Sequence, residues 1–180
     1  MINARFSSEM RGIIRKIINE QFVGYKVKEI DERGTITDGI IHIFTENLSL
    51  IISNEEKKIP WFDSQSLSSE EQICVFQCVN GDKKQRQDIM VVNEKIKKIE
   101  IITDYIKIPT KKYEIALDMA LIIKTDMHEY MISRGWYFEE CLTISKDKDL
   151  EDVYSIKQVQ EEWNNFGEWE VFVERRIEEL

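Results

Sequence analysis

The stretch KIEIITDYIKIPTKKYEIALDMALIIK, residues 98–124, contains two long apolar segments separated by a proline, and it decides the fold class. Residues 98–108 are predicted to form a long strand, which Pro109 ends because proline cannot donate a ladder hydrogen bond. The alternation of apolar and polar positions slips at Ile101 and Ile102, which predicts a β-bulge. Residues 115–124 are almost continuously apolar and predict a central strand buried on both faces.

Short alternating segments on both sides of this stretch predict further strands. Asn80-Gly81-Asp82 is a strong turn signal, so we expect residues 88–92 to pair back onto residues 73–79. The remaining segments indicate antiparallel meanders with short turns. The predicted strands outside the central stretch are 25–30, 36–44, 48–53, 73–79, 88–92, 128–133, 137–145 and 169–177.

Two helices are predicted. Apolar residues recur at helical spacing from Met10 to Phe22, with Ser7 or Ser8 as the N-cap and Gly24 as the stop. Near the other end, Ser155 and Gln158 have the spacing of a capping box before an apolar helix face that extends to residue 166. An amphipathic helix must cover something, and the predicted sheet is the nearest apolar surface.

The order of these elements shows no regular alternation of strand and helix. We therefore expect an α+β fold with a largely antiparallel, curved sheet and with the N-terminal and C-terminal helices packed on it. The 180 residues fit one domain, residues 1–180, and the composition of 42% hydrophobic and 33% charged residues is ordinary for a globular fold.

The three cysteines, Cys74, Cys78 and Cys141, are an odd and sparse set. Cys74 and Cys78 fall in one predicted strand, where a rise of about 3.3 Å per residue separates their Cα atoms by about 13 Å. A disulfide needs a separation below about 7 Å, and the same distance excludes a shared tetrahedral zinc. We expect three free thiols, no metal and no cofactor.

No apolar run approaches the length of about 20 residues that spans a bilayer, and residues 1–8 have no signal-peptide core. We therefore expect a cytoplasmic protein of bacterial or phage origin without a membrane partner. The net charge is −9, and residues 151–180 hold nine acidic and three basic side chains. Such an end repels phosphate backbones and attracts cationic partners.

Most catalytic and nucleotide-binding motifs are absent from the sequence. Two acids, Asp104 and Asp118, interrupt apolar strands, where a carboxylate is costly unless it is paired. If the two strands are adjacent, both acids could face one polar pocket with His42, which would suit a hydrolase or a small-ligand protein. Alternatively, each acid lies on a solvent face or is bridged to an arginine.

Aromatic residues interleaved with acids are typical of protein interfaces, and acids do not suit stacking on nucleic acid. The basic cluster at residues 83–86 makes nucleic acid only a minor possibility. The candidate partner-binding residues lie at the acidic end, with two tryptophans as apolar anchors: Glu151, Asp152, Glu161, Glu162, Glu168, Glu170, Trp136 and Trp169. Glu161 and Glu162 are expected on the solvent side of the last helix.

Three stretches, residues 98–104, 130–140 and 154–163, resemble segments of uncharacterised bacterial proteins, some of which are similar to immunity proteins of toxin systems. This resemblance implies a small acidic α+β protein that binds and blocks a cognate toxin. It transfers no functional residue.

The leading hypothesis is therefore a non-catalytic protein-binding module, of the immunity type, that neutralises a basic protein partner such as a toxin. One alternative is the hydrolase or ligand-binding pocket around Asp104 and Asp118. Another is a phage-encoded inhibitor of a host nucleic-acid-binding complex, which would also be acidic.

Overall fold

The computed structural model describes residues 1–30, 35–36, 39–60, 70–135, 137, 140–164 and 169–180. Within these ranges the chain is mostly antiparallel sheet with a few short helices, which confirms the expected α+β character at this level. The elements in chain order are β1 (Ile2–Ala4), α1 (Ser8–Arg15), β2 (Gln21–Val27), β3 (Thr35–Ile36), β4 (Ile40–Thr45), β5 (Ser49–Pro60), β6 (Glu70–Asn80), the 3₁₀ turn η1 (Lys83–Gln85), β7 (Met90–Ile108), the 3₁₀ turn η2 (Pro109–Lys111), β8 (Tyr113–Thr125), β9 (Glu129–Arg134), β10 (Leu142–Lys146), α2 (Leu150–Val153), α3 (Ile156–Asn164) and β11 (Phe172–Glu179).

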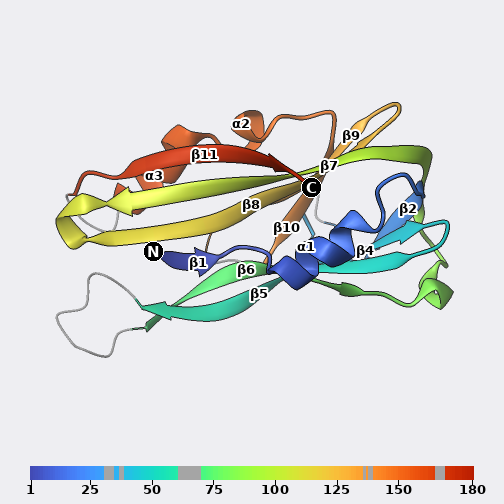
Figure 1. Cartoon of the computed structure of the whole chain (residues 1–180), viewed down its shortest axis with the longest axis horizontal. Coiled ribbons are helices and arrows are strands. Elements are labelled where there is room, and N and C mark those ends of the chain that lie inside the picture. Colours follow the sequence, from blue (N-terminus) through green and yellow to red (C-terminus); the bar gives the residue numbers. More distant parts are fainter. Residues whose placement is uncertain (31–34, 37–38, 61–69, 136, 138–139, 165–168) are drawn as a thin grey trace.

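The long strand β7 joins the two parts of an open sheet (Figure 1). Within the described residues the strand order is β3-β10-β9-β8-β7-β2-β4-β5-β6, with β1 beside β8 and β11 beside β7. Near its start β7 pairs with β2, where Lys95 lies opposite Gln21. From Ile96 onwards it pairs with β8, and residues 100–107 also pair with β11. The register of this one strand therefore positions both parts of the sheet.

A bulge at the centre of the β7–β8 pair decides which way its polar side chains point. The register shifts between Ile102 and Thr103, which leaves Met119 of β8 without a direct partner on β7. The pairing is thus irregular where the slip at Ile101 and Ile102 predicts it, but the extra residue lies in β8 and not in β7. Thr103 lies opposite Asp118, so their side chains share a face. The next residue, Asp104, points to the other face because side chains alternate along a strand.

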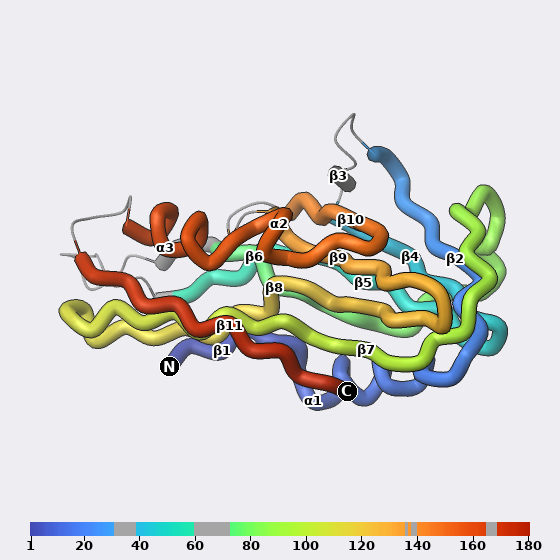
Figure 2. Tube along the Cα trace, turned by 90° about the horizontal axis from the view of Figure 1, so that it is seen from above, coloured from blue at the N-terminus to red at the C-terminus, as the bar shows by residue number. Residues whose placement is uncertain are grey.

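Two apolar clusters fill the interior, and helices contribute to both. Helix α1 and the turn after it place Ile14 and Ile17, both fully buried, in a cluster with residues of β2, β4 and β7. Helix α3 places Val159 and Trp163 in a second cluster with residues of β7 and β8. Figure 2 shows α1 and the α2–α3 pair on opposite sides of the β7–β8 pair. Each helix therefore packs its apolar face against the sheet.

The first helix is shorter than its apolar spacing predicts. It ends at Arg15, and after a turn the chain enters β2 at Gln21. Gly24 does not stop a helix. It lies in β2 beside a register shift, and a Cβ atom there would lie only 2.3 Å from the Met90 carbonyl oxygen. The close approach of β2 to β7 requires this glycine, and the sequence pattern could not distinguish that requirement from a helix end.

The hairpin expected after the turn at residues 80–82 is also wrong. Residues 90–92 begin β7 and pair with β2, while the only strand beside β6 within the described residues is β5. The 3₁₀ turn η1 lies between β6 and β7, and its capping residue Asp82 accepts a hydrogen bond from the Lys84 N–H. The turn signal is therefore real, but the chain that leaves it pairs elsewhere.

The capping box at the start of α3 is confirmed. The Ser155 N–H donates to Oε1 of Gln158 at 2.8 Å, and the Gln158 N–H donates to Oγ of Ser155 at 3.2 Å. Ser7 likewise caps α1 by accepting from the Met10 N–H. Both signals depend on residues three apart, which is why the sequence predicts them well.

Candidate functional site

Asp104 is fully buried on β7 and pairs with Arg175 of β11. The guanidinium donates two hydrogen bonds, from Nε to Oδ1 at 2.7 Å and from Nη2 to Oδ2 at 2.8 Å. Burial raises the pKa of Asp104, against the opposing effect of the Arg175 charge. Nη1 of Arg175 reaches Glu151 at 2.6 Å and the Tyr154 carbonyl oxygen at 2.9 Å. This pair therefore connects β11 and the region of α2 to the sheet.

Asp118 is also fully buried, on the opposite face of the β7–β8 pair. The Thr103 hydroxyl donates to Oδ1 at 2.6 Å, and the backbone N–H of Phe6 donates to Oδ2 at 2.7 Å. Nε of Arg5 and Nη2 of Arg11 each lie 3.4 Å from the carboxylate. Asp118 therefore fixes the N-terminal segment and α1 to the sheet.

The structure does not bring Asp104, Asp118 and His42 together. The two aspartates lie on adjacent strands, as expected, but the bulge turns them to opposite faces, and each is bound to arginine. His42 lies on β4, opposite Lys26 of β2 and Ile51 of β5. The alternative in which arginine bridges each acid fits this geometry, and the shared pocket does not.

The acids of the α2–α3 region differ in how freely they face solvent. Asp152 and Glu170 are exposed. Glu161 is exposed on α3 and lies 3.5 Å from Nζ of Lys157, an i,i+4 pair that contributes only a few tenths of a kcal/mol. Glu151 is held by Arg175. Glu168 lies outside the described residues.

Glu162 does not lie on the solvent side of α3 as expected. It is half-buried, and its carboxylate accepts a hydrogen bond from the hydroxyl of buried Tyr154. Burial raises the pKa of Glu162 to about 7. The helix is short and packs against β11, so a position next to its apolar face is already partly enclosed.

The aromatic anchor also differs from the expectation. Trp169 is partly buried: its indole N–H donates to the Trp163 carbonyl oxygen at 3.3 Å, and Nζ of Lys111 lies 4.7 Å from the ring centroid. Trp136 lies outside the described residues. Two apolar side chains of β11 are exposed instead, Phe172 at 48% and Ile177 at 63%. Alternation predicted this strand, but it could not show which of its apolar residues would remain uncovered.

Strand β11 lies at an edge of the sheet (Figure 1). It pairs with β7 in an uninterrupted register from Phe172, opposite Lys107, to Glu179, opposite Glu100. Within the described residues no other strand pairs with it. An edge strand of eight residues presents a row of backbone N–H and C=O groups along its free side.

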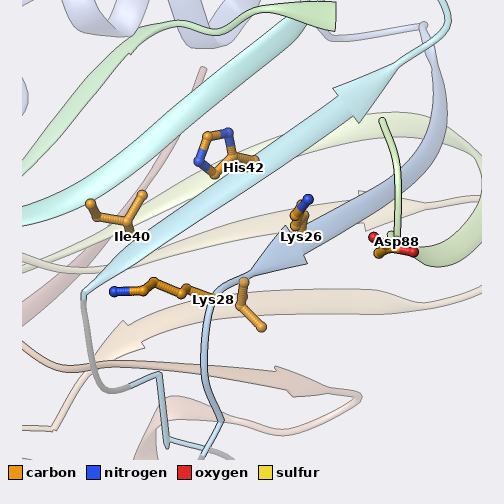
Figure 3. Close-up of a pocket in the computed structure, with 6 residues that line it drawn as sticks. Lys26, Lys28, Ile40, His42 and Asp88 are labelled. Atoms are coloured by element: carbon orange, nitrogen blue, oxygen red, sulfur yellow. The ribbon is translucent and has the colours of Figure 1, made fainter. Parts of the chain in front are cut away.

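A basic cavity of about 470 Å³ opens on the side of the sheet formed by β2 and β4 (Figure 3). Lys26 and Lys28 come from β2 and its end, Ile40 and His42 come from β4, and Asp88 comes from the segment before β7. Nζ of Lys26 donates to the Gln87 carbonyl oxygen at 3.0 Å. The His42 ring stacks at 6.3 Å on Phe44, which is fully buried. His42 stood out in the sequence as one of two histidines, whereas the two lysines carried no signal there.

A second hollow of about 320 Å³ lies at the start of α1. Its two arginines, Arg5 and Arg11, are engaged with Asp118 and also reach Glu178 at 2.7 Å and 2.6 Å. Positive and negative groups balance there, and the network connects the N-terminal segment to β11. Its described lining is Asn3, Arg5, Phe6, Ser7, Ser8, Arg11 and Glu178.

The thiols and one arginine are buried without a reactive arrangement. Burial raises the pKa of Cys74 to about 11 and that of Cys78 to about 12, so neither is an activated nucleophile. Arg134 is fully buried on β9, and its Nη1 donates to the Cys74 carbonyl oxygen of β6. Its guanidinium lies 4.8 Å from the centroid of the Phe76 ring, so Arg134 connects the two strands.

No protein-family model, no curated protein and no solved structure matches the chain. In the part of the chain that the structure describes, no group of three histidine, cysteine, aspartate or glutamate residues could hold a metal ion. Over the same residues, the helices are too short or too polar to cross a membrane.

Proposed function

We propose that this protein is a non-catalytic binding module that neutralises a basic protein partner, in the manner of an immunity protein. The observation that carries the proposal is the edge strand β11, which exposes Phe172 and Ile177 and against which α3, with its acids, packs. Exposed apolar side chains surrounded by charge are typical of protein interfaces.

The acidic end would steer the partner into place. Asp152, Glu161 and Glu170 are exposed, and α3 packs against β11, so these acids border the same edge. Clustered charges of one sign raise the association rate of an oppositely charged partner, and salt limits the reach of this attraction to about 8–10 Å near physiological ionic strength. Steering by these acids would therefore act mainly on association.

The edge of β11 would then provide the close contact. A strand of the partner can add to a free edge through backbone hydrogen bonds, with side-chain contacts setting specificity. Phe172 and Ile177 lie near opposite ends of β11 and, being five positions apart, project from opposite faces of the strand, so they would contact the partner on either side of the added strand. We infer that Phe172 replaces Trp169 as the aromatic anchor, since Trp169 is already in contact with Trp163 and Lys111.

The proposal is tested by capturing the partner with a photo-crosslinking residue at position 172 and measuring binding with both proteins purified. The double reversal Glu161→Lys and Glu170→Lys should slow association about tenfold or more at low salt and less at high salt. Phe172→Ala should act mainly on dissociation.

The matched control is Glu55→Lys with Glu56→Lys, the same charge change at exposed positions on β5. It should change the association rate about twofold or less, because these positions lie away from β11. Equal losses from both double variants, or an association rate indifferent to salt, would contradict the proposed face. A captured host nucleic-acid-binding complex instead of a toxin would favour the phage-inhibitor alternative for the same surface.

A further inference from the structure

The cavity between β2 and β4 gathers positive charge on a protein that is otherwise acidic. Lys26 lies directly opposite His42 in the strand pairing, so both side chains project from the same face. Lys28 lies on the same side one pleat further along, and Asp88 is the single described carboxylate in the lining. The two lysines are opposite in sign to the net charge of the chain, which is −9.

The Lys26 ammonium is held in position before any ligand arrives. It donates one hydrogen bond to the Gln87 carbonyl oxygen at 3.0 Å. An ammonium group has three donors, so two remain for a bound anion. Holding a long side chain in place reduces the entropy that binding would otherwise cost. The next residue, Asp88, has a left-handed backbone with φ 57°, so the loop turns at the cavity mouth.

The same loop extends the positive potential beyond the cavity. The segment between β6 and β7 supplies Asp88 and also the exposed Lys83 and Lys84 of η1. Cations clustered near a concave site raise the local concentration of anions and their rate of entry. The basic cluster at residues 83–86 would thus attract anions to the cavity. It has no part in the proposed acidic binding face.

We propose that this cavity binds a small phosphomonoester that carries hydroxyl groups, such as a nucleoside monophosphate or a sugar phosphate. The phosphate would rest between Lys26 and Lys28, where charge-assisted hydrogen bonds to its oxygens are strong. In Figure 3, Asp88 lies on the other side of Lys26 from Lys28, where its carboxylate can accept from a ligand hydroxyl. Ile40 provides apolar contact, and a volume of about 470 Å³ suits a ligand of this size.

The test is a titration of the ¹⁵N-labelled full chain with adenosine monophosphate, inorganic phosphate and adenosine. Adenosine monophosphate should shift the backbone signals of residues 26–28, 40–42 and 87–88. Its affinity should exceed that of phosphate or adenosine alone at least tenfold. Signals that shift only elsewhere, or phosphate that binds as tightly as the nucleotide, would overturn the proposal.

Paired variants separate a specific site from general attraction. Lys26→Ala with Lys28→Ala should lower the affinity about tenfold or more, whereas Lys83→Ala with Lys84→Ala, with the same charge change outside the described lining, should lower it about twofold. Lys28→Glu is a second variant that should also weaken binding of adenosine monophosphate. Because Lys28 is exposed, this change should leave the melting temperature unchanged. Equal losses from both double variants would overturn the proposal. So would tighter binding of a ten-nucleotide RNA or an anionic vesicle than of adenosine monophosphate.

Discussion

The two buried aspartates, on opposite faces of the β7–β8 pair, carry carboxylate charges that are stabilised by different sets of partners. Among the described residues, Asp104 is paired with one arginine, Arg175, through two short hydrogen bonds. Asp118 has two arginines at 3.4 Å, together with a threonine hydroxyl and a backbone N–H. A buried carboxylate with one cation depends entirely on it, while a carboxylate with several partners can lose one and remain largely satisfied.

The two sites also connect different parts of the chain. Asp104 joins β7 to the last strand, and Arg175 continues the connection to Glu151 beside α2. Asp118 joins β8 to the first residues of the chain and to α1. Both ends of the sequence are therefore attached to the central strand pair through ion pairs that would not tolerate removal of the aspartate.

The largest effect is expected from Arg175→Met. It removes the charge but keeps much of the volume, and an uncompensated buried carboxylate costs about 3–5 kcal/mol. The matched variant Arg11→Met should cost less, about 1.5–3 kcal/mol, because Arg5 and the two neutral donors remain with Asp118. Urea unfolding of both variants at pH 7 measures the difference. If both variants lost the same free energy of unfolding, the second arginine would not compensate the Asp118 charge when Arg11 is removed.

The next effect tests whether α1 and the turn after it belong to the core on the Asp118 face. Ile14→Ala and Ile17→Ala should each lower the free energy of unfolding by about 2–5 kcal/mol, the usual range for truncating a fully buried side chain. Ile13→Ala, at a partly buried position of α1, is the control and should cost less. Thermal melts that leave all three variants unchanged would show that the helix face is not packed.

The smallest effect is a pH dependence on the Asp104 face. The pKa of Glu162 is raised from its usual 4.5 to about 7. Between these values the unfolded chain releases the proton and the folded protein keeps it, so stability falls as pH rises from about 4.5 to about 7. Glu162→Gln should remove this part of the decline, because an amide can still bind Tyr154 without becoming charged.

The control for this measurement is Glu161→Gln on the exposed side of the same helix. It should leave the slope of melting temperature against pH unchanged, since Glu161 only pairs with Lys157 in solvent. A Glu162→Gln curve parallel to that of the wild type would contradict the assignment.

Local signals in the sequence predicted the parts of this fold that depend on neighbouring residues. The capping box at Ser155 is confirmed, and the pairing of β7 is irregular next to Ile102 as expected, because each signal follows from residues only a few positions apart. The first helix was predicted too long because Phe22 continues the helical spacing by chance while lying in β2. Apolar spacing alone cannot separate a longer helix from a turn that leads into a strand.

The candidate sites depended more strongly on distant contacts. Buried acids in apolar strands were recognisable as unusual, but their partners were not, because Arg175 lies 71 residues from Asp104. The free edge of β11 and the cavity between β2 and β4 arise from strand order and register. A residue's exposure depends on which elements cover it, and periodicity carries no information about that.

The sequence by itself determined the α+β class, the two central strands and the acidic C-terminal end, because composition and short-range periodicity act through local backbone preferences and charge. Only the tertiary structure decided which face each aspartate occupies, that Glu162 is half-buried and that Phe172 is exposed. It also decided that Lys26 and His42 meet at one cavity. These facts follow from pairing between distant segments, and one residue of shift in a strand moves every side chain to the other face.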